Sequence, residues 1–169
     1  MNREKINIVD ELNNIIGVKY RDEIDYQIDR YQCTGLFITN STGEVLVAQR
    51  KLTKEKDPGK WSCAVAGTVE EGETFESNIY KEAEEEIGLT GVSFDLGPLQ
   101  KNEKPRKNYA QWFTAKVDLP ITAFVLQEDE VEQLLWVNAE DLIEDVKSHP
   151  DKYVPSFKSI LPQLLSKKF

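Results

Sequence analysis

The stretch from Thr74 to Gly88 constrains the fold more than any other, because it reads as one amphipathic helix with defined ends. Threonine commonly caps the N-terminus of a helix, and glycine commonly ends a helix in the left-handed conformation. Between these ends, apolar residues recur at every fourth position, which predicts a buried stripe along one face. The stripe consists of Ile79, Ala83 and Ile87.

A second face of this helix carries three carboxylates. Glu82, Glu85 and Glu86 stand at positions i, i+3 and i+4, so their side chains are expected to gather together. Crowded carboxylates raise one another's pKa, and a bound divalent cation removes that penalty. Carboxylate oxygens are ligands that Mg²⁺ prefers, alongside water and phosphates. On its own, however, a Glu-rich helix is more often a solvated surface.

The spacing around the helix favours the metal site. Gly67 is followed after five residues by Glu73, and after seven more by the run Lys81-Glu82-Ala83-Glu84-Glu85-Glu86-Ile87-Gly88-Leu89. This frame resembles the box of the Nudix family: Gly, five residues, Glu, seven residues, then Arg-Glu-apolar-any-Glu-Glu-any-Gly-apolar. Ala83 is smaller than the usual aliphatic residue, and Lys81 replaces the arginine. Lysine keeps the charge and lacks the planar fork, so this departure bears on catalytic rate and removes no metal ligand.

The resemblance implies an α/β protein with the Nudix fold, in which a mixed β-sheet lies between helices. Residues 67–89 would form its loop-helix-loop. The resemblance also implies hydrolysis of a diphosphate linkage in a nucleoside diphosphate-type substrate, by attack of water on phosphorus without a covalent intermediate. The implied cofactor is Mg²⁺, with Mn²⁺ as a substitute.

Carried over by position, the resemblance also assigns roles to residues of the box. Glu82 and Glu86 would bind the metal, together with the backbone carbonyl of Gly67. Glu85 would be a further ligand or the base for the attacking water, with Glu82 as the second catalytic carboxylate. The residues that would support these groups from behind are Glu73 and Lys81.

Charged residues outside the box offer further candidates. Glu128 or Glu130 could supply the additional glutamate that Nudix enzymes often take from another loop, although an exposed acidic turn is the commoner interpretation. Arg50, Lys51 and Lys60 flank the strands that lead into the box and could hold the diphosphate. Ordinary solubilising charge explains each of the three equally well.

Aromatic, thiol and imidazole groups give weaker signals. Cys33 and Cys63 lack metal-ligand spacing and are expected to be packed thiols. The single histidine, His149, is expected to lie exposed at a helix end, which disfavours a Ser-His-Asp or Cys-His mechanism. Four aromatic residues could stack on a base, although at strand spacing each is more often a core residue. They are Trp61, Tyr109, Trp112 and Trp136.

The rest of the chain predicts one domain over residues 1–169, with alternating strands and helices. Residues 1–30 are expected to hold an N-terminal strand pair and a linker, in which 22–30 is a short helix or a loop. Asn138 is expected to cap a helix that ends at His149-Pro150, and Pro162 to kink or restart the last helix. The other expected elements are a hairpin over 32–49, a basic loop over 50–60, and strands over 61–66, 92–96, 108–117 and 131–137.

Composition limits the partners. A net charge of −9 argues against broad capture of nucleic acid or anionic membrane, and leaves a small-molecule diphosphate as the expected partner. No apolar run is long enough to cross a bilayer, and no signal-peptide core follows Met1 to Lys5. We therefore expect a cytoplasmic protein. The N-terminal strands and aromatic residues could serve a homodimer interface.

Two alternatives stay open. The general layout also resembles isopentenyl-diphosphate isomerases, which share the fold. The resemblance includes the segment Pro58-Gly59-Lys60-Trp61 before the box. Those enzymes need a cysteine just before the box glycine and a histidine just after it, where this chain has Ala66 and Thr68. The other alternative is a binding module that senses a nucleotide without cleaving it, for which Lys81 is the only support.

Overall fold

Strand β3 (Arg30–Thr39) organises the sheet, because other strands hydrogen-bond along both of its edges. β8 (Asn108–Lys116) runs parallel to β3 along the whole of one edge. The other edge is shared in succession by β1 (Lys5–Val9), β6 (Val65–Thr68) and β4 (Glu44–Arg50), all antiparallel. The computed structural model describes residues 3–166, and the predicted domain limits 1 and 169 lie outside the described residues.

The outer strands complete a mixed sheet of nine strands. β2 (Ile15–Tyr20) extends the sheet beyond β1, and β7 (Asp95–Asn102) pairs with β8. β9 (Val131–Asn138) and β5 (Trp61–Cys63) both pair with β4. Three short 3₁₀ helices lie in the connections: η1 (Arg21–Glu23), η2 (Ile121–Ala123) and η3 (Pro150–Lys152).

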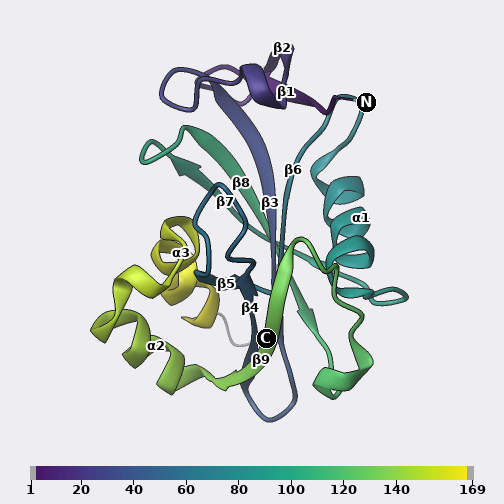
Figure 1. The fold of residues 1–169 in the computed structure, drawn as a ribbon, viewed down its shortest axis with the longest axis vertical. Helices are drawn as coiled ribbons and strands as arrows, with labels where there is room; N and C mark the ends of the chain where they lie inside the picture. Colours follow the sequence, from purple (N-terminus) through teal and green to yellow (C-terminus); the bar gives the residue numbers. More distant parts are fainter. Residues whose placement is uncertain (1–2, 167–169) are drawn as a thin grey trace.

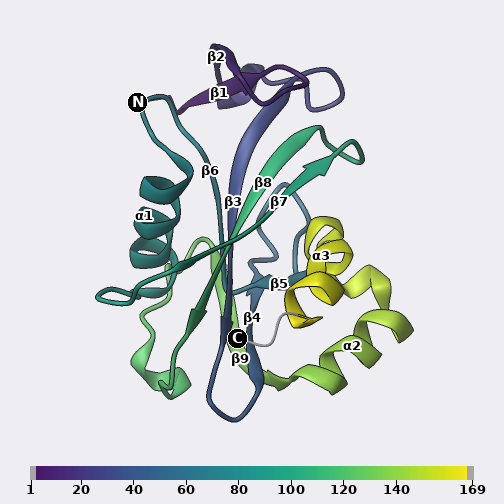
Figure 2. The same ribbon diagram turned by 180° about the vertical axis from the view of Figure 1, so that it is seen from behind.

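Helices cover the two faces of this sheet, as Figures 1 and 2 show. α1 (Phe75–Ile87) lies on one face, where its apolar stripe packs against Leu36 and Ile38 of β3. α2 (Ala139–Ser148) and α3 (Pro155–Ser166) lie on the other face, where Phe157 and Leu164 pack against Phe37. Successive residues of β3 therefore enter two different cores, as the alternation of a strand requires. The predicted α/β architecture is confirmed.

Most of the predicted elements are present. The N-terminal strand pair, the hairpin of β3 and β4, and the strands β8 and β9 occur within a few residues of the expected limits. Asn138 caps α2 by accepting hydrogen bonds from two backbone N–H groups of the first turn. Residues 22–30, expected to be a short helix or a loop, form the end of η1 and a turn. Within residues 3–166, no helix combines the length and apolar character that crossing a bilayer requires.

Two predicted strands were wrong in extent. The strand over 61–66 is two strands, because the chain leaves β4 after Cys63 and joins β3 from Val65 onward. The fully buried Ala64 lies at this change of partner. The strand over 92–96 begins only at Asp95 and continues to Asn102. Phe94 instead stacks on Tyr80 of α1, with ring centroids 4.3 Å apart, which keeps this segment out of the sheet.

Of the two outcomes predicted at Pro162, a kink or a restart of the helix, the restart does not occur. α3 runs through this proline as one helix from Pro155 to Ser166. Proline removes one backbone donor within a helix, which weakens that turn. Leu161 and Leu164 are almost completely buried on either side of it, so packing against the sheet keeps both halves of the segment helical.

Both ends of α1 form as its sequence predicts. The Thr74 hydroxyl accepts a hydrogen bond from the Ser77 backbone N–H at 3.1 Å, and the Ser77 hydroxyl accepts one from the Thr74 N–H at 2.9 Å. At the other end Gly88 has φ 66°, in the left-handed region that favours glycine. These caps fix where the helix begins and ends, and so fix which residues face the sheet.

We expect Thr74→Ala to lower the free energy of unfolding by about 1 kcal/mol, because one N-terminal amide of α1 loses its acceptor. Urea unfolding followed by circular dichroism measures this loss. Thr53→Ala is the matched control, since Thr53 is exposed in the loop before β5. An equal loss in both variants would show that the cap contributes nothing specific.

Candidate functional site

The backbone of β6 approaches α1 closely at Gly67. A Cβ atom at this position would lie 2.7 Å from the Asn78 side-chain oxygen and would collide with the Glu82 side chain. Glycine is therefore required by the close contact between strand and helix. This contact places the backbone of Gly67 beside the first carboxylate of the predicted metal site.

Asn78 connects the helix to the sheet, a role that its place in the sequence alone does not predict. Its side chain is fully buried and accepts a hydrogen bond from the Thr34 hydroxyl of β3. The side-chain amide donates to the Thr68 backbone carbonyl at 3.1 Å, to Glu73 at 2.9 Å and to Glu82 at 3.2 Å. Its position four residues before Glu82, beside the apolar stripe, was the only available signal.

Lys81 holds the acidic side chains at the start of the helix together. Its ammonium group lies 2.8 Å from a Glu70 carboxylate oxygen and 2.7 Å from one of Glu73. Burial alone would lower the pKa of Lys81, but the hydrogen bonds to these carboxylates outweigh it and raise the pKa. For Glu73, the Lys81 ammonium, the Glu70 amide and Asn78 together outweigh burial and lower the pKa. Lysine thus reaches two carboxylates at the place where the Nudix box has arginine.

Glu82 and Glu86 are half-buried and oppose each other's ionisation. Burial raises the pKa of Glu82 to about 7, with Lys81 acting against this and Glu85 adding to it. Burial and the negative charge of Glu82 raise the pKa of Glu86 to about 8. The Ala66 backbone N–H donates to Glu86 at 3.2 Å, which ties this carboxylate to β6. The two groups form an acidic region between helix and strand, which Lys81, 3.7 Å from a Glu82 oxygen, compensates only in part.

The third predicted carboxylate stands apart from this pair. Glu85 is exposed, although it lies near enough to Glu82 to raise its pKa. With the side chains as they stand, no three His, Cys, Asp or Glu groups within residues 3–166 converge closely enough to hold a metal ion. The donor set nevertheless suits a hard divalent cation. Two half-buried carboxylates and the Gly67 backbone supply oxygen ligands, and a cation would relieve their mutual repulsion.

A small cleft opens beside Glu86. Arg50 at the end of β4 and Glu130 before β9 line it together with Glu86. Glu130 also pairs with Lys54, at 2.5 Å. Glu128 is exposed and does not line the cleft, so of the two proposed extra carboxylates the structure brings only Glu130 to the box.

The three predicted diphosphate-binding cations differ in position. Arg50 lines the cleft, as described, and its guanidinium donates to the Lys56 backbone carbonyl at 3.0 Å. Lys51 pairs with Glu132 at 3.0 Å. Lys60 pairs with Asp57 at 3.3 Å. Neither of these lysines lines the cleft, so Arg50 is the best placed of the three.

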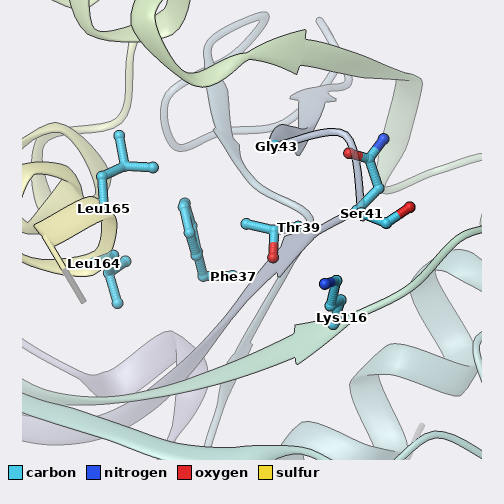
Figure 3. Close-up of a pocket in the computed structure, with 8 residues that line it drawn as sticks. Phe37, Thr39, Ser41, Gly43, Lys116, Leu164 and Leu165 are labelled. Atoms are coloured by element: carbon cyan, nitrogen blue, oxygen red, sulfur yellow. The ribbon is translucent and has the colours of Figure 1, made fainter. Parts of the chain in front are cut away.

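A larger hollow of about 270 Å³ lies elsewhere, between the β3–β4 turn and the end of α3. Figure 3 shows Phe37 and Thr39 of β3, Lys116 of β8 and the leucines of α3 around it. Among residues 3–166, Lys116 is the one charged residue in its lining. No carboxylate of the box reaches this hollow, which therefore belongs to a different part of the molecule.

The remaining candidates are mostly structural. Trp112 and Tyr109 are core residues, whereas Trp61 and Trp136 are partly buried at the edges of the two cores. Burial raises the pKa of both thiols, Cys33 and Cys63, to about 12, as expected for packed cysteines. His149 follows α2, and its imidazole lies 2.7 Å from Asp145.

Comparison with known proteins agrees with this geometry. Residues 30–157 match the NUDIX domain family. The Nudix hydrolase YfcD of Escherichia coli is 31% identical over 140 residues, which cover 82% of this chain and 76% of that protein. The isopentenyl-diphosphate Delta-isomerase of Corynebacterium diphtheriae is 25% identical over 163 residues, covering 90% and 88%. The crystal structure of DR0079 from Deinococcus radiodurans superposes with a TM-score of 0.82 at 18% identity, covering 95% and 98%.

We expect the metal-free protein to lose stability as pH rises from about 4.5 to about 8. Glu86 has a higher pKa when folded than when unfolded, so the folded chain takes up a proton in this window. Above about pH 8 the half-buried Glu86 carboxylate is charged in the folded protein, and the full free-energy cost of burying that charge lowers stability. Glu86→Gln cannot titrate, so its thermal midpoint in EDTA should exceed that of the wild type by about 3 °C at pH 9 and by little at pH 5.

Glu84→Gln provides the matched control for this measurement. It removes the same charge from an exposed position of the same helix. The burial argument would be contradicted if the difference in thermal midpoint between Glu86→Gln and the wild type were equally large at pH 5 and pH 9. It would also be contradicted if Glu84→Gln showed the same difference.

Proposed function

The chain belongs to the Nudix family of hydrolases, and from that premise we propose that it cleaves a phosphoanhydride bond in a nucleoside diphosphate-type compound. The observation that carries this proposal is the pair Glu82 and Glu86. Both are half-buried against β6, both have a raised pKa, and neither has a short ion pair that neutralises it. Such a pair suits a site for a cation and a phosphate.

We further propose Mg²⁺ as the cofactor, with Mn²⁺ as a substitute. Glu82, Glu86 and the Gly67 carbonyl would hold it, and Glu85 would be a further ligand or the base. When bound, the ion supplies positive charge to the phosphate oxygens and lowers the pKa of a bound water. The chain itself fixes the ligands: Asn78 orients Glu82, and the Ala66 amide orients Glu86.

Other side chains would act on the substrate and the water. Glu85 is exposed near Glu82, where its carboxylate can accept a proton from an approaching water molecule. Arg50 lines the cleft beside Glu86, where its guanidinium can hold a phosphate through two parallel hydrogen bonds. Glu130 would be the extra carboxylate. Lys81 and Glu73 would keep Glu82 in place without touching substrate.

The isomerase alternative gains nothing from the residues of this site. Its required cysteine would stand at Ala66, and the two thiols that the chain does have are buried with raised pKa values. The Cys63 thiol donates its proton in a hydrogen bond to the Val65 carbonyl at 3.1 Å. The homodimer, the single domain and the cytoplasmic location stay predictions.

A substrate screen tests the proposed function. The protein would be incubated with nucleoside triphosphates, dinucleoside polyphosphates, nucleotide sugars and isopentenyl diphosphate in Mg²⁺ or Mn²⁺. Chromatography would separate the nucleotide, phosphate and prenyl products. Metal-dependent release supports hydrolysis. Isomerised isopentenyl diphosphate would favour the isomerase alternative, and thermal stabilisation by a nucleotide without turnover would favour the binding module.

We expect Glu86→Gln to lower turnover by about a hundredfold or more, because it removes a proposed metal ligand while preserving side-chain size. Glu84→Gln should retain normal turnover, since its side chain is exposed and stands at a position of the box that accepts any residue. Steady-state kinetics on the best substrate of the screen measures both. Near-normal activity of Glu86→Gln would show that the assignment of the metal ligands is wrong.

We expect Lys81→Arg to preserve the rate within about twofold or to raise it, because a guanidinium can bond Glu70 and Glu73 through separate N–H groups. Lys81→Met should lose about tenfold or more, since both carboxylates lose their cation. The comparison uses kcat at saturating metal. A large loss in Lys81→Arg would mean that the neighbouring side chains fit lysine only.

A further inference from the structure

Positively charged side chains gather around Tyr26, in the turn that follows η1. The Lys56 ammonium lies 3.3 Å from the centroid of the Tyr26 ring, and the Arg106 guanidinium carbon lies 5.8 Å from it. These residues come from three separate segments: the turn before β3, the loop before β5 and the loop before β8. A cluster built from distant segments is a product of the fold and not of a local charge run. We call Lys56, Arg106 and Tyr26 the Tyr26 cluster.

Carboxylates neutralise this cluster only in part. Asp57 lies 3.7 Å from Arg106 and is shared with Lys60. Lys56 is half-buried, and within residues 3–166 no carboxylate oxygen lies within 4 Å of its ammonium group. Burial and the nearby Arg106 lower the pKa of Lys56 to about 8. The fold therefore holds a lysine where its charge is disfavoured, and an anion would relieve this.

Two arginines whose charges help to lower the pKa of Lys56 also contact the box or the cleft beside it. Arg50 lines the cleft, and its guanidinium donates to the backbone carbonyl of Lys56 at 3.0 Å. Arg21 pairs with Glu4, and its guanidinium also donates to the Thr68 hydroxyl at 3.3 Å, next to Gly67 of the box. Arg50 therefore connects the cleft to the loop that carries Lys56.

We propose that the Tyr26 cluster binds a second phosphate group of the substrate, separate from the phosphoanhydride that is cleaved. Lys56 and Arg106 would contact the phosphate oxygens, and Tyr26 would position Lys56. The substrate class is then a nucleotide compound with a further phosphate beyond the scissile bond, such as a polyphosphate chain or a terminal phosphomonoester. This inference rests on the proposed function for its identification of the ligand as part of the substrate.

A phosphate fits this cluster better than other anions. It is compact, carries up to two charges and offers oxygen acceptors in several directions, which suits an ammonium group and a guanidinium that approach from different segments. A nucleic acid would need a broad positive surface, which a chain of net charge −9 does not favour. The small extent of the cluster matches one phosphate group.

The test is binding of inorganic phosphate in EDTA at constant ionic strength, measured by isothermal titration calorimetry. Without divalent metal, the carboxylates of the box repel phosphate, so binding reports the cluster. We expect the dissociation constant to rise about tenfold in Lys56→Gln and in Arg106→Gln, each of which removes a charge-assisted hydrogen bond. Lys152→Gln, at an exposed lysine of η3, is the matched control and should stay within about twofold of the wild type.

Two further measurements keep the test decisive. Lys56→Arg should retain phosphate binding, which separates loss of charge from loss of folding, and circular dichroism checks the fold of each variant. Malonate, an anion of similar charge, should bind at least about fivefold more weakly than phosphate. Equal binding of malonate would overturn the assignment to phosphate. No phosphate binding by the wild type, or unchanged binding in Lys56→Gln and Arg106→Gln, would overturn the site.

The outcome is independent of hydrolysis. If phosphate binding depends on Lys56 and Arg106 while no diphosphate compound is cleaved, the anion site stands and the proposed hydrolysis fails. If hydrolysis occurs and phosphate binding does not depend on Lys56 or Arg106, the proposed hydrolysis stands and the anion site fails. Among cleaved substrates, Lys56→Gln should raise KM about tenfold for those with the further phosphate and leave kcat within about twofold.

Discussion

The buried amide of Asn78 is the interaction on which the site depends. A polar side chain inside a protein must find hydrogen-bond partners, and Asn78 finds them on β3, on the strand end at Thr68 and on two carboxylates of the box. These bonds fix the rotation and depth of α1 against the sheet. The positions of Glu82 and Glu86 follow, because both stand on later turns of the same helix. Apolar packing alone would hold the helix less specifically.

Charge separation explains how a strongly acidic chain can attract a phosphate compound. Lys81 pairs closely with Glu70 and Glu73, whereas it neutralises Glu82 only weakly, and Glu86 keeps a raised pKa. Arg50 stands across the cleft, with Lys56 and Arg106 beyond it. The local distribution of charge, and not the net charge of −9, therefore decides what this face can bind.

Local signals were predictable from the sequence, and contacts between distant segments were not. Thr74 and Gly88 could be identified as helix ends because capping depends on the residue itself and its near neighbours. The change of strand partner at Ala64 could not, because it depends on where β3 and β4 lie. Glu130 could not be preferred over Glu128 for the same reason. The helix does not restart at Pro162, because packing outweighed a local preference.

The parallel pairing of β3 with β8 has a consequence for how the molecule folds. It joins residues such as Tyr31 and Asn108, which are 77 positions apart, and the box helix lies in the chain between them. Such pairing requires closure of a long loop before it gains stabilising contacts, so it tends to form slowly. The core under α1 includes Phe113 and Ala115 of β8. We therefore expect α1 to reach its final packing position only after β3 and β8 have paired. The catalytic surface would then form late in folding.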